Sequence, residues 1–196
     1  MSKSLDFYFD VGSPAAYLAW TQVPRIAAET GATVHERPIL LGGVFQATGN
    51  RSPMEVAAKS RWLHEDLNRF AARYGVPFRL SPHFPINTLA LMRIALGLQM
   101  REPAKLRPYV DAVMHAIWVD GRNMNDPAEV ASVLQQAGFD PQALLALAQD
   151  PEVKERLKAA TQEAVARGVF GAPTFFVGDQ MFWGQDRLDF VKESLQ

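Results

Sequence analysis

The sequence predicts an α/β fold in which the two ends of the chain share one sheet and a helical segment is inserted between them. The pattern of the first fifty residues indicates strand, helix and strand, and residues 174–196 indicate a hairpin and a helix. Most of the segment between them has helical periodicity. A single sheet with a large all-helical insertion is the simplest architecture for this order. We therefore expect a discontinuous sheet domain over residues 1–50 and 168–196, and a helical insertion domain over residues 51–167.

The composition is that of an ordinary globular protein, with 48% hydrophobic residues, 21% charged residues and a net charge of −1. This balance does not indicate a nucleic-acid surface or an anionic membrane partner. The absence of cysteine excludes disulfides, thiolate metal sites and a cysteine nucleophile. We find no signal-peptide core and no membrane-spanning stretch, and we expect a cytoplasmic protein without nucleic-acid or membrane partners.

The first strand and the first helix meet at a turn. Residues 5–9 are apolar and aromatic, which is typical of a buried strand. Gly12 supplies the turn, Ser13 has the chemistry of a helix N-cap, and Pro14 suits the first helical position. Backbone N–H groups and a hydroxyl should converge here, which suits an anion, although the same residues would also serve as a helix cap alone.

The next elements follow from periodicity and breakers. The first helix should end at Gly31, with a kink or an early end at Pro24. Residues 33–39 predict a second strand, and Pro38 marks either the end of this strand or a sheet edge. Residues 40–50, rich in small side chains, predict an irregular loop.

A capping-box pattern at residues 52–55 predicts a helix that reaches Tyr74. Its expected core stripe consists of Val56, Leu63, Leu67, Phe70 and Tyr74. Residues 76–85 contain three prolines and predict an extended connector.

The rest of the middle segment predicts further helices. Asp126, Asp140 and Asp150 each precede a proline, a repeated start signal for a helix. After Gly168, residues 174–177 and 180–183 predict a hairpin, and a last helix should begin near residue 186.

This order of elements resembles the thioredoxin superfamily in its disulfide-oxidoreductase branch, and implies a thioredoxin-like fold with a large all-helical insertion. Residues 13–16, Ser-Pro-Ala-Ala, stand where that branch has Cys-Pro-X-Cys. Within the branch, the sequence is similar to the 2-hydroxychromene-2-carboxylate isomerase family, kin of the kappa-class glutathione transferases. The matching segments are residues 6–10, 13–14, 17–19, 37–42, 48–50, 66–70, 169–174 and 181–187.

The resemblance implies glutathione as a cofactor that is not consumed, and a small aromatic substrate. The family converts 2-hydroxychromene-2-carboxylate-type compounds to trans-o-hydroxybenzylidene pyruvates, in bacterial breakdown of aromatics. Thiolate addition, bond rotation and elimination would accomplish this. A homodimer is a further expectation from the resemblance.

The resemblance also assigns residues to the sulfur end of glutathione. Ser13 would face the sulfur as the catalytic residue and hold the thiolate by a hydrogen bond. Pro173 would be the cis-proline of the fold and would turn the backbone of Ala172 toward the cysteinyl peptide group. Tyr17 lies one turn beyond Ser13 and could line the wall for the substrate, or equally belong to the core.

The two carboxylate ends of glutathione would be held by other residues. Asn50 and Lys59 keep the spacing that kappa-class enzymes use around the glycine carboxylate. Gln185 and Asp186 match the polar pair at the γ-glutamyl end, although the family often has Asn or Ser where Gln185 stands. Asp186 could also be the N-cap of the last helix.

Three alternatives stay open from the sequence. A kappa-class-like transferase or peroxidase shares every residue above, and a glutathione-binding module without catalysis differs only in lacking the chemistry. A hydrolase or metal enzyme is disfavoured, because no serine lies in a Gly-x-Ser-x-Gly elbow and the four histidines lack zinc-ligand spacing. We therefore expect no metal.

Overall fold

A computed structural model describes residues 3–196 of the chain. The elements of this range, in chain order, are β1 (Ser4–Phe9), α1 (Pro14–Thr30), β2 (Thr33–Pro38), α2 (Leu41–Thr48), η1 (Pro53–Glu55), α3 (Ala57–Tyr74), α4 (Leu89–Arg101), η2 (Pro103–Lys105), α5 (Leu106–Trp118), α6 (Pro127–Gln136), α7 (Pro141–Gln149), α8 (Pro151–Ala166), β3 (Thr174–Val177), β4 (Gln180–Trp183), η3 (Gln185–Arg187) and α9 (Leu188–Ser194). The η elements are single 3₁₀ turns. This is the predicted α/β fold, and the predicted strands, the hairpin and most helices are confirmed.

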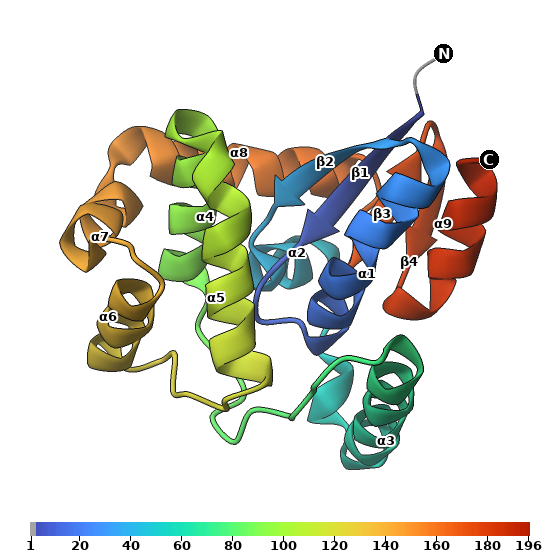
Figure 1. Cartoon of the computed structure of the whole chain (residues 1–196), viewed down its shortest axis with the longest axis horizontal. Helices are drawn as coiled ribbons and strands as arrows, with labels where there is room; N and C mark the ends of the chain where they lie inside the picture. The colour runs from blue at the N-terminus through green and yellow to red at the C-terminus, as the bar shows by residue number, and fades with distance from the viewer. Residues whose placement is uncertain (1–2) are drawn as a thin grey trace.

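The sheet is built from both ends of the chain, as predicted (Figure 1). Its strand order is β2-β1-β3-β4, with β1 and β2 parallel and the other neighbours antiparallel. β2 is an edge strand, where the proline at its end costs no ladder hydrogen bond. The parallel β1-α1-β2 unit and the terminal hairpin therefore place the turn after β1 next to the segment that enters β3.

The two faces of β1 contact different parts of the molecule. Leu5, Phe7 and Phe9 are buried in the main core, with α1 and the helical middle segment. The alternate residues face α2 and α8, where Tyr8 and Phe176 belong to a second apolar cluster. This period of two is that of a strand covered on both faces.

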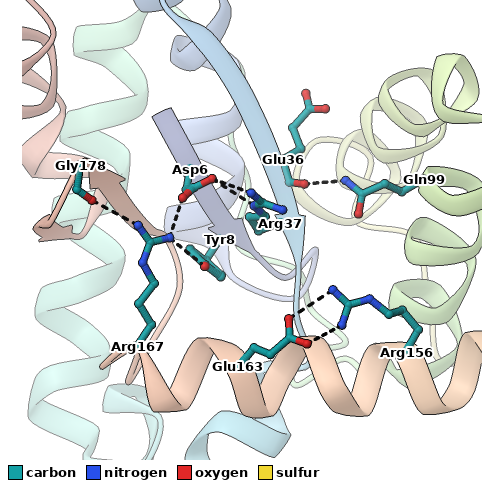
Figure 2. A network of polar contacts seen from close by, with 9 residues as sticks. All are labelled: Asp6, Tyr8, Glu36, Arg37, Gln99, Arg156, Glu163, Arg167 and Gly178. Carbon is teal, nitrogen blue, oxygen red and sulfur yellow. Dashed lines mark hydrogen bonds and ion pairs between the residues drawn. The ribbon is translucent and has the colours of Figure 1, made fainter. Parts of the chain in front are cut away.

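A polar network closes the edge of the second cluster. Figure 2 shows Arg167, which follows α8, donating hydrogen bonds to Asp6 and Tyr8 on β1 and to the carbonyl oxygen of Gly178. Arg37 on β2 donates to the same Asp6 carboxylate at 2.9 Å. Burial alone would raise the pKa of Asp6, but the hydrogen bonds and charges of the two arginines hold it below its ordinary value.

Pro24 neither ends nor interrupts α1, contrary to the expected kink or early end. A proline removes one helical N–H and leaves the carbonyl four residues earlier without its partner. Here that carbonyl belongs to Trp20, and Arg107 of α5 donates to it at 3.4 Å. The partner from another helix compensates for the missing hydrogen bond, and the helix continues to Gly31, which caps it with φ 71°.

The loop predicted over residues 40–50 was wrong, because Leu41–Thr48 forms helix α2. Its two adjacent glycines disfavour a helix locally. Packing overrides this preference, since Val44 is fully buried and the Gly43 backbone lies close to Thr161 of α8. A Cβ atom at position 43 would lie 3.2 Å from the Thr161 methyl group, so glycine permits this close approach of α2 to α8.

The long helix after Ser52 starts later than the capping box predicted. Ser52 caps the 3₁₀ turn η1, α3 begins at Ala57, and Gly75 ends it as expected. Val56 therefore lies before the helix in extended conformation and is 50% exposed, so its place in the core stripe was wrong.

The main core crosses the expected boundary between the sheet domain and the insertion. Leu5 and Phe7 of β1 belong to the same cluster as Trp118 of α5 and Leu157 of α8. The division at residues 51–167 stays a prediction.

The three predicted aspartate caps are confirmed, each accepting a backbone N–H of the helix it precedes. In the described residues, no helix is both long and apolar enough to cross a membrane.

Candidate active site

A cavity of about 1070 Å³ lies where the start of α1 meets segments from distant parts of the chain. Its walls come from the turn after β1, from α2, η1 and α3, from the connector that precedes α4, and from the segments on either side of the β3–β4 hairpin. In Figure 1, α3 stands apart from the helical middle and lies below α1. The volume is that of a small-molecule site.

Ser13 lines this cavity and caps α1, as the sequence predicted. Its extended backbone (φ −96°, ψ 117°) lets its side-chain oxygen accept from the N–H of Ala16 at 3.2 Å. The same hydroxyl donates to the carbonyl oxygen of Ala172 at 2.8 Å. A polarised hydroxyl thus lies at a helix N-terminus, where the partial positive charge favours an anion.

The Ala172–Pro173 peptide bond is cis, as predicted, and both residues line the cavity. The segment is held from the hairpin, because Gly184 donates its N–H to the Pro173 carbonyl oxygen at 3.0 Å. A second cis bond, Phe84–Pro85, was not foreseen, and it lines the cavity from the connector before α4.

Asn50 and Lys59 both line the cavity, on the side of α2 and α3. The Asn50 amide donates to the Phe170 carbonyl oxygen at 2.9 Å, which ties the end of α2 to the segment before Pro173. Lys59 is exposed and forms no ion pair with any residue in the range 3–196. The sequence analysis missed Arg51, a second cation in this wall.

Gln185 and Asp186 also line the cavity, in the 3₁₀ turn η3. Gln185 is buried, and its backbone carbonyl accepts from the Tyr74 hydroxyl at 2.7 Å. Asp186 pairs with Arg187 at 3.4 Å and lies over Gly184. Asp186 does not cap the last helix, because that helix begins at Leu188 without a side-chain cap.

Tyr17 does not line the cavity. Its ring is buried against Phe78, and its hydroxyl donates to the Pro77 carbonyl oxygen at 2.6 Å. Tyr17 lies one helical turn after Ser13, and its side chain packs in the core and not in the cavity. A place in the core was the second of its two expected roles. Burial raises the pKa of its phenol.

Sequence reasoning missed four aromatic side chains in the cavity wall: Phe45 of α2, Trp62 of α3, Phe84 of the connector before α4 and Trp183 of β4. Trp62 is 59% exposed and Trp183 is 47% exposed, and the exposed Val56 lies in the same wall. The available signal was a tryptophan on α3 outside its apolar stripe. An exposed aromatic ring in an open cavity is typical of a binding surface.

Asp10, which the sequence analysis included only in the matching segment 6–10, is a further residue of the site. Asp10 is 1% exposed and lines the cavity behind Ser13. Burial raises the pKa of its carboxyl, while hydrogen bonds from Leu41, Gly12 and Thr88 oppose the rise. A charged residue at the end of a buried strand was the signal that could have identified it.

Residues 4–196 match a known domain family. A family model described as DSBA-like thioredoxin domain matches residues 4–196. The chain belongs to this family. The predicted thioredoxin-like fold is confirmed. Residues 13–16 lie at the end of the turn after β1 and at the start of α1.

Among DSBA-like thioredoxin proteins, the chain is similar to named isomerases. It is 37% identical to a 2-hydroxychromene-2-carboxylate isomerase of Sphingobium xenophagum, with 100% of this chain and 99% of that protein covered. A solved structure of a 2-hydroxychromene-2-carboxylate isomerase has a TM-score of 0.85 and 32% identity, with coverage of 98% of this chain and 94% of that chain. Glutathione S-transferase kappa 2 of Caenorhabditis elegans is 29% identical, with coverage of 98% and 92%. The predicted family resemblance, and the prediction of an enzyme of the isomerase type, are confirmed.

Proposed function

We propose that the protein is a glutathione-dependent isomerase acting on small aromatic carboxylates of the 2-hydroxychromene-2-carboxylate type. The observation that carries the proposal is the Ser13 hydroxyl, placed at a helix N-terminus, within 2.8 Å of the Ala172 carbonyl oxygen and open to a cavity. The full-length similarity to named isomerases supports the choice of reaction.

The residues around the cavity fit glutathione. Ser13 and the first N–H groups of α1 suit a thiolate, and the backbone of Ala172 next to Pro173 suits a peptide group in extended conformation. Lys59 offers an ammonium group that forms no ion pair with residues 3–196, which suits a carboxylate, and Asn50 lies in the same wall. Gln185 and Asp186 offer polar groups for the γ-glutamyl end, where Asp186 would pair with the ammonium group.

When bound, glutathione supplies a thiolate that adds reversibly to a conjugated carbon–carbon double bond, so that the bond can rotate before the thiolate leaves. A free thiol has a pKa of about 8.5 and is mostly protonated at neutral pH. The Ser13 hydroxyl can turn from Ala172 and donate its hydrogen to the sulfur. The α1 N-terminus adds partial positive charge, and both effects lower the thiol pKa.

The aromatic substrate requires an apolar wall beside the sulfur position. Trp62 and Val56 provide exposed apolar surface in the same cavity, and the half-buried Phe45 lies in the wall with them. Arg51 lies in the wall with them and supplies a positive charge for the substrate carboxylate. We assign the substrate to this side of the cavity, in place of the wall expected at Tyr17.

The test is isomerisation of 2-hydroxychromene-2-carboxylate, followed with and without reduced glutathione. The proposal predicts a rate that depends on glutathione and returns the cofactor unchanged. Release of a glutathione conjugate would instead identify a kappa-type transferase. Binding of glutathione without any turnover would identify a binding module, and an equal rate without glutathione would overturn the proposal.

A further inference from the structure

Asp10 is a buried carboxylate without a basic partner. It is 1% exposed, and no Lys, Arg or His in the range 3–196 forms an ion pair with it. Three donors reach it instead: the N–H of Gly12 at 2.9 Å, the N–H of Leu41 at 2.8 Å and the Thr88 hydroxyl at 3.0 Å. A buried charge is costly unless hydrogen bonds replace its water, and these three do so.

The three donors belong to three different walls of the cavity. Gly12 is in the turn that precedes Ser13, Leu41 is the first residue of α2, and Thr88 precedes α4. Gly12, Leu41 and Thr88 all line the cavity together with Asp10. One carboxylate therefore joins the Ser13 turn to two helices that are distant in sequence.

The helix starts show that this junction replaces ordinary capping. Thr88 is the N-cap residue of α4, yet its hydroxyl accepts no N–H of that helix, and Asn87 accepts the Leu89 N–H at 3.2 Å. Leu40, the N-cap residue of α2, has no capping side chain, and Asp10 accepts the first N–H of α2. A threonine in this position would ordinarily cap its own helix.

Thr88 also packs directly against the turn. A Cβ atom added to Gly12 would meet the Thr88 methyl group at 2.7 Å, a distance that real Cβ contacts do not reach. Thr88 therefore holds the Ser13 turn in two ways. Its methyl group packs against Gly12, and its hydroxyl donates to Asp10, which in turn accepts the Gly12 N–H. The Ser13 N–H donates to the Asp10 backbone carbonyl at 3.0 Å, which continues the junction to the catalytic position.

We propose that Asp10, through its hydrogen bond from Thr88, is the positioning residue that fixes the Ser13 turn against α2 and α4 and sets the acidity of a thiol held there. The inference deepens the proposed function, because it concerns the residue expected to face the glutathione sulfur. Loss of the Thr88 hydroxyl would loosen the turn and draw the backbone N–H groups at the start of α1 away from position 13. Weaker donation to the sulfur raises the pKa of a thiol at that point.

The test needs no glutathione, because the chain has no cysteine and Ser13→Cys places a single reporter thiol at position 13. Its pKa is read from the pH dependence of alkylation by iodoacetamide. In this background, Thr88→Val keeps the shape of the side chain and removes the hydroxyl. We expect alkylation at pH 7 to slow by roughly threefold or more, as for a pKa raised by half a unit.

Two further variants separate positioning from general damage. Thr88→Ser keeps the hydroxyl, loses the methyl group and should restore the thiol pKa. Thr161→Val removes another buried hydroxyl, equally 7% exposed, that accepts the Leu40 N–H at 3.1 Å beside α2, and it should leave the pKa unchanged.

If Thr88→Val does not fold, Thr88→Ala is measured in its place with the same expectation. An unchanged thiol pKa in the Thr88 variant, or an equal shift in Thr161→Val, would overturn the inference. Neither outcome depends on whether glutathione binds, so failure of the proposed function would be seen separately in the isomerisation assay.

Discussion

The Ser13 hydroxyl donates a hydrogen bond to the carbonyl oxygen of Ala172 at 2.8 Å, across a separation of 159 residues. This contact joins the turn after β1 to the segment before β3, at the edge where the sheet ends. The same hydroxyl can turn its hydrogen bond from this carbonyl oxygen to a thiolate, because a charged sulfur is a stronger acceptor.

Ser13→Ala should lose both stability and chemistry. Removing an N-cap costs about 1 kcal/mol, which thermal unfolding would measure. Loss of a hydrogen bond to a charged group should slow glutathione-dependent isomerisation by roughly 10- to 100-fold. Asp140→Ala is the matched control, because Asp140 caps α7 far from the cavity in the same manner. If the Asp140 variant lost as much activity for the same loss of stability, Ser13 would be a cap alone.

Trp62→Ala should weaken binding of the aromatic substrate without destabilising the fold. The ring is 59% exposed, so little packing is lost, whereas the apolar wall of the cavity loses an exposed aromatic ring. We expect KM for the chromene carboxylate to rise severalfold and the affinity for glutathione to stay unchanged. Phe190→Ala removes another half-exposed aromatic ring outside the cavity, and a similar rise in KM in that variant would contradict the assignment.

Gly184→Ala should weaken glutathione binding through Asp186. Gly184 has φ 104°, and the Asp186 carboxylate occupies the place of its missing side chain. A Cβ atom there must displace Asp186, in addition to a backbone strain of about 1–3 kcal/mol. Gly178→Ala also places a side chain at a positive φ, 58°, in the adjacent turn, with nothing near its Cβ. Calorimetry should find weaker glutathione binding in the first variant only; equal binding in both would remove Asp186 from the site.

The Asp6 network should make stability depend on pH in the acid range. Because its native pKa is lowered by Arg167 and Arg37, Asp6 contributes stability above its unfolded pKa of about 3.9, and this contribution is lost as pH falls through the native pKa. Urea unfolding of Asp6→Asn should approach wild-type stability at low pH and fall below it at neutral pH. A constant difference at every pH would contradict this account.

Local patterns in the sequence were sufficient for the sheet and for the Ser13 turn. Apolar runs, glycine turns and Ser-Pro or Asp-Pro caps act within a few residues, so β1, the hairpin and the starts of α1, α6, α7 and α8 could be predicted. Pro24 and α2 could not, since their helices depend on Arg107 and on packing against α8, which are distant in sequence.

The same limit applies to the candidate site. The resemblance placed Ser13, Ala172 and Pro173, and the structure gathers them in one cavity. The link between Asp10 and Thr88 spans 78 residues, and no local pattern marks it. The orientation of Tyr17 likewise depends on a distant segment, because its hydroxyl donates to the Pro77 carbonyl oxygen in the connector before α4.

The most direct test of the central claim is the ultraviolet absorbance of thiolate in bound glutathione, titrated against pH in wild type, Ser13→Ala and Ser13→Asp. The account predicts that wild type lowers the thiol pKa below its free value of about 8.5, and that alanine raises it by about 1–2 units. Aspartate should raise it further, because it places a like charge beside the sulfur. Coincident titration curves in the three proteins, with glutathione bound, would contradict the claim that Ser13 holds a thiolate.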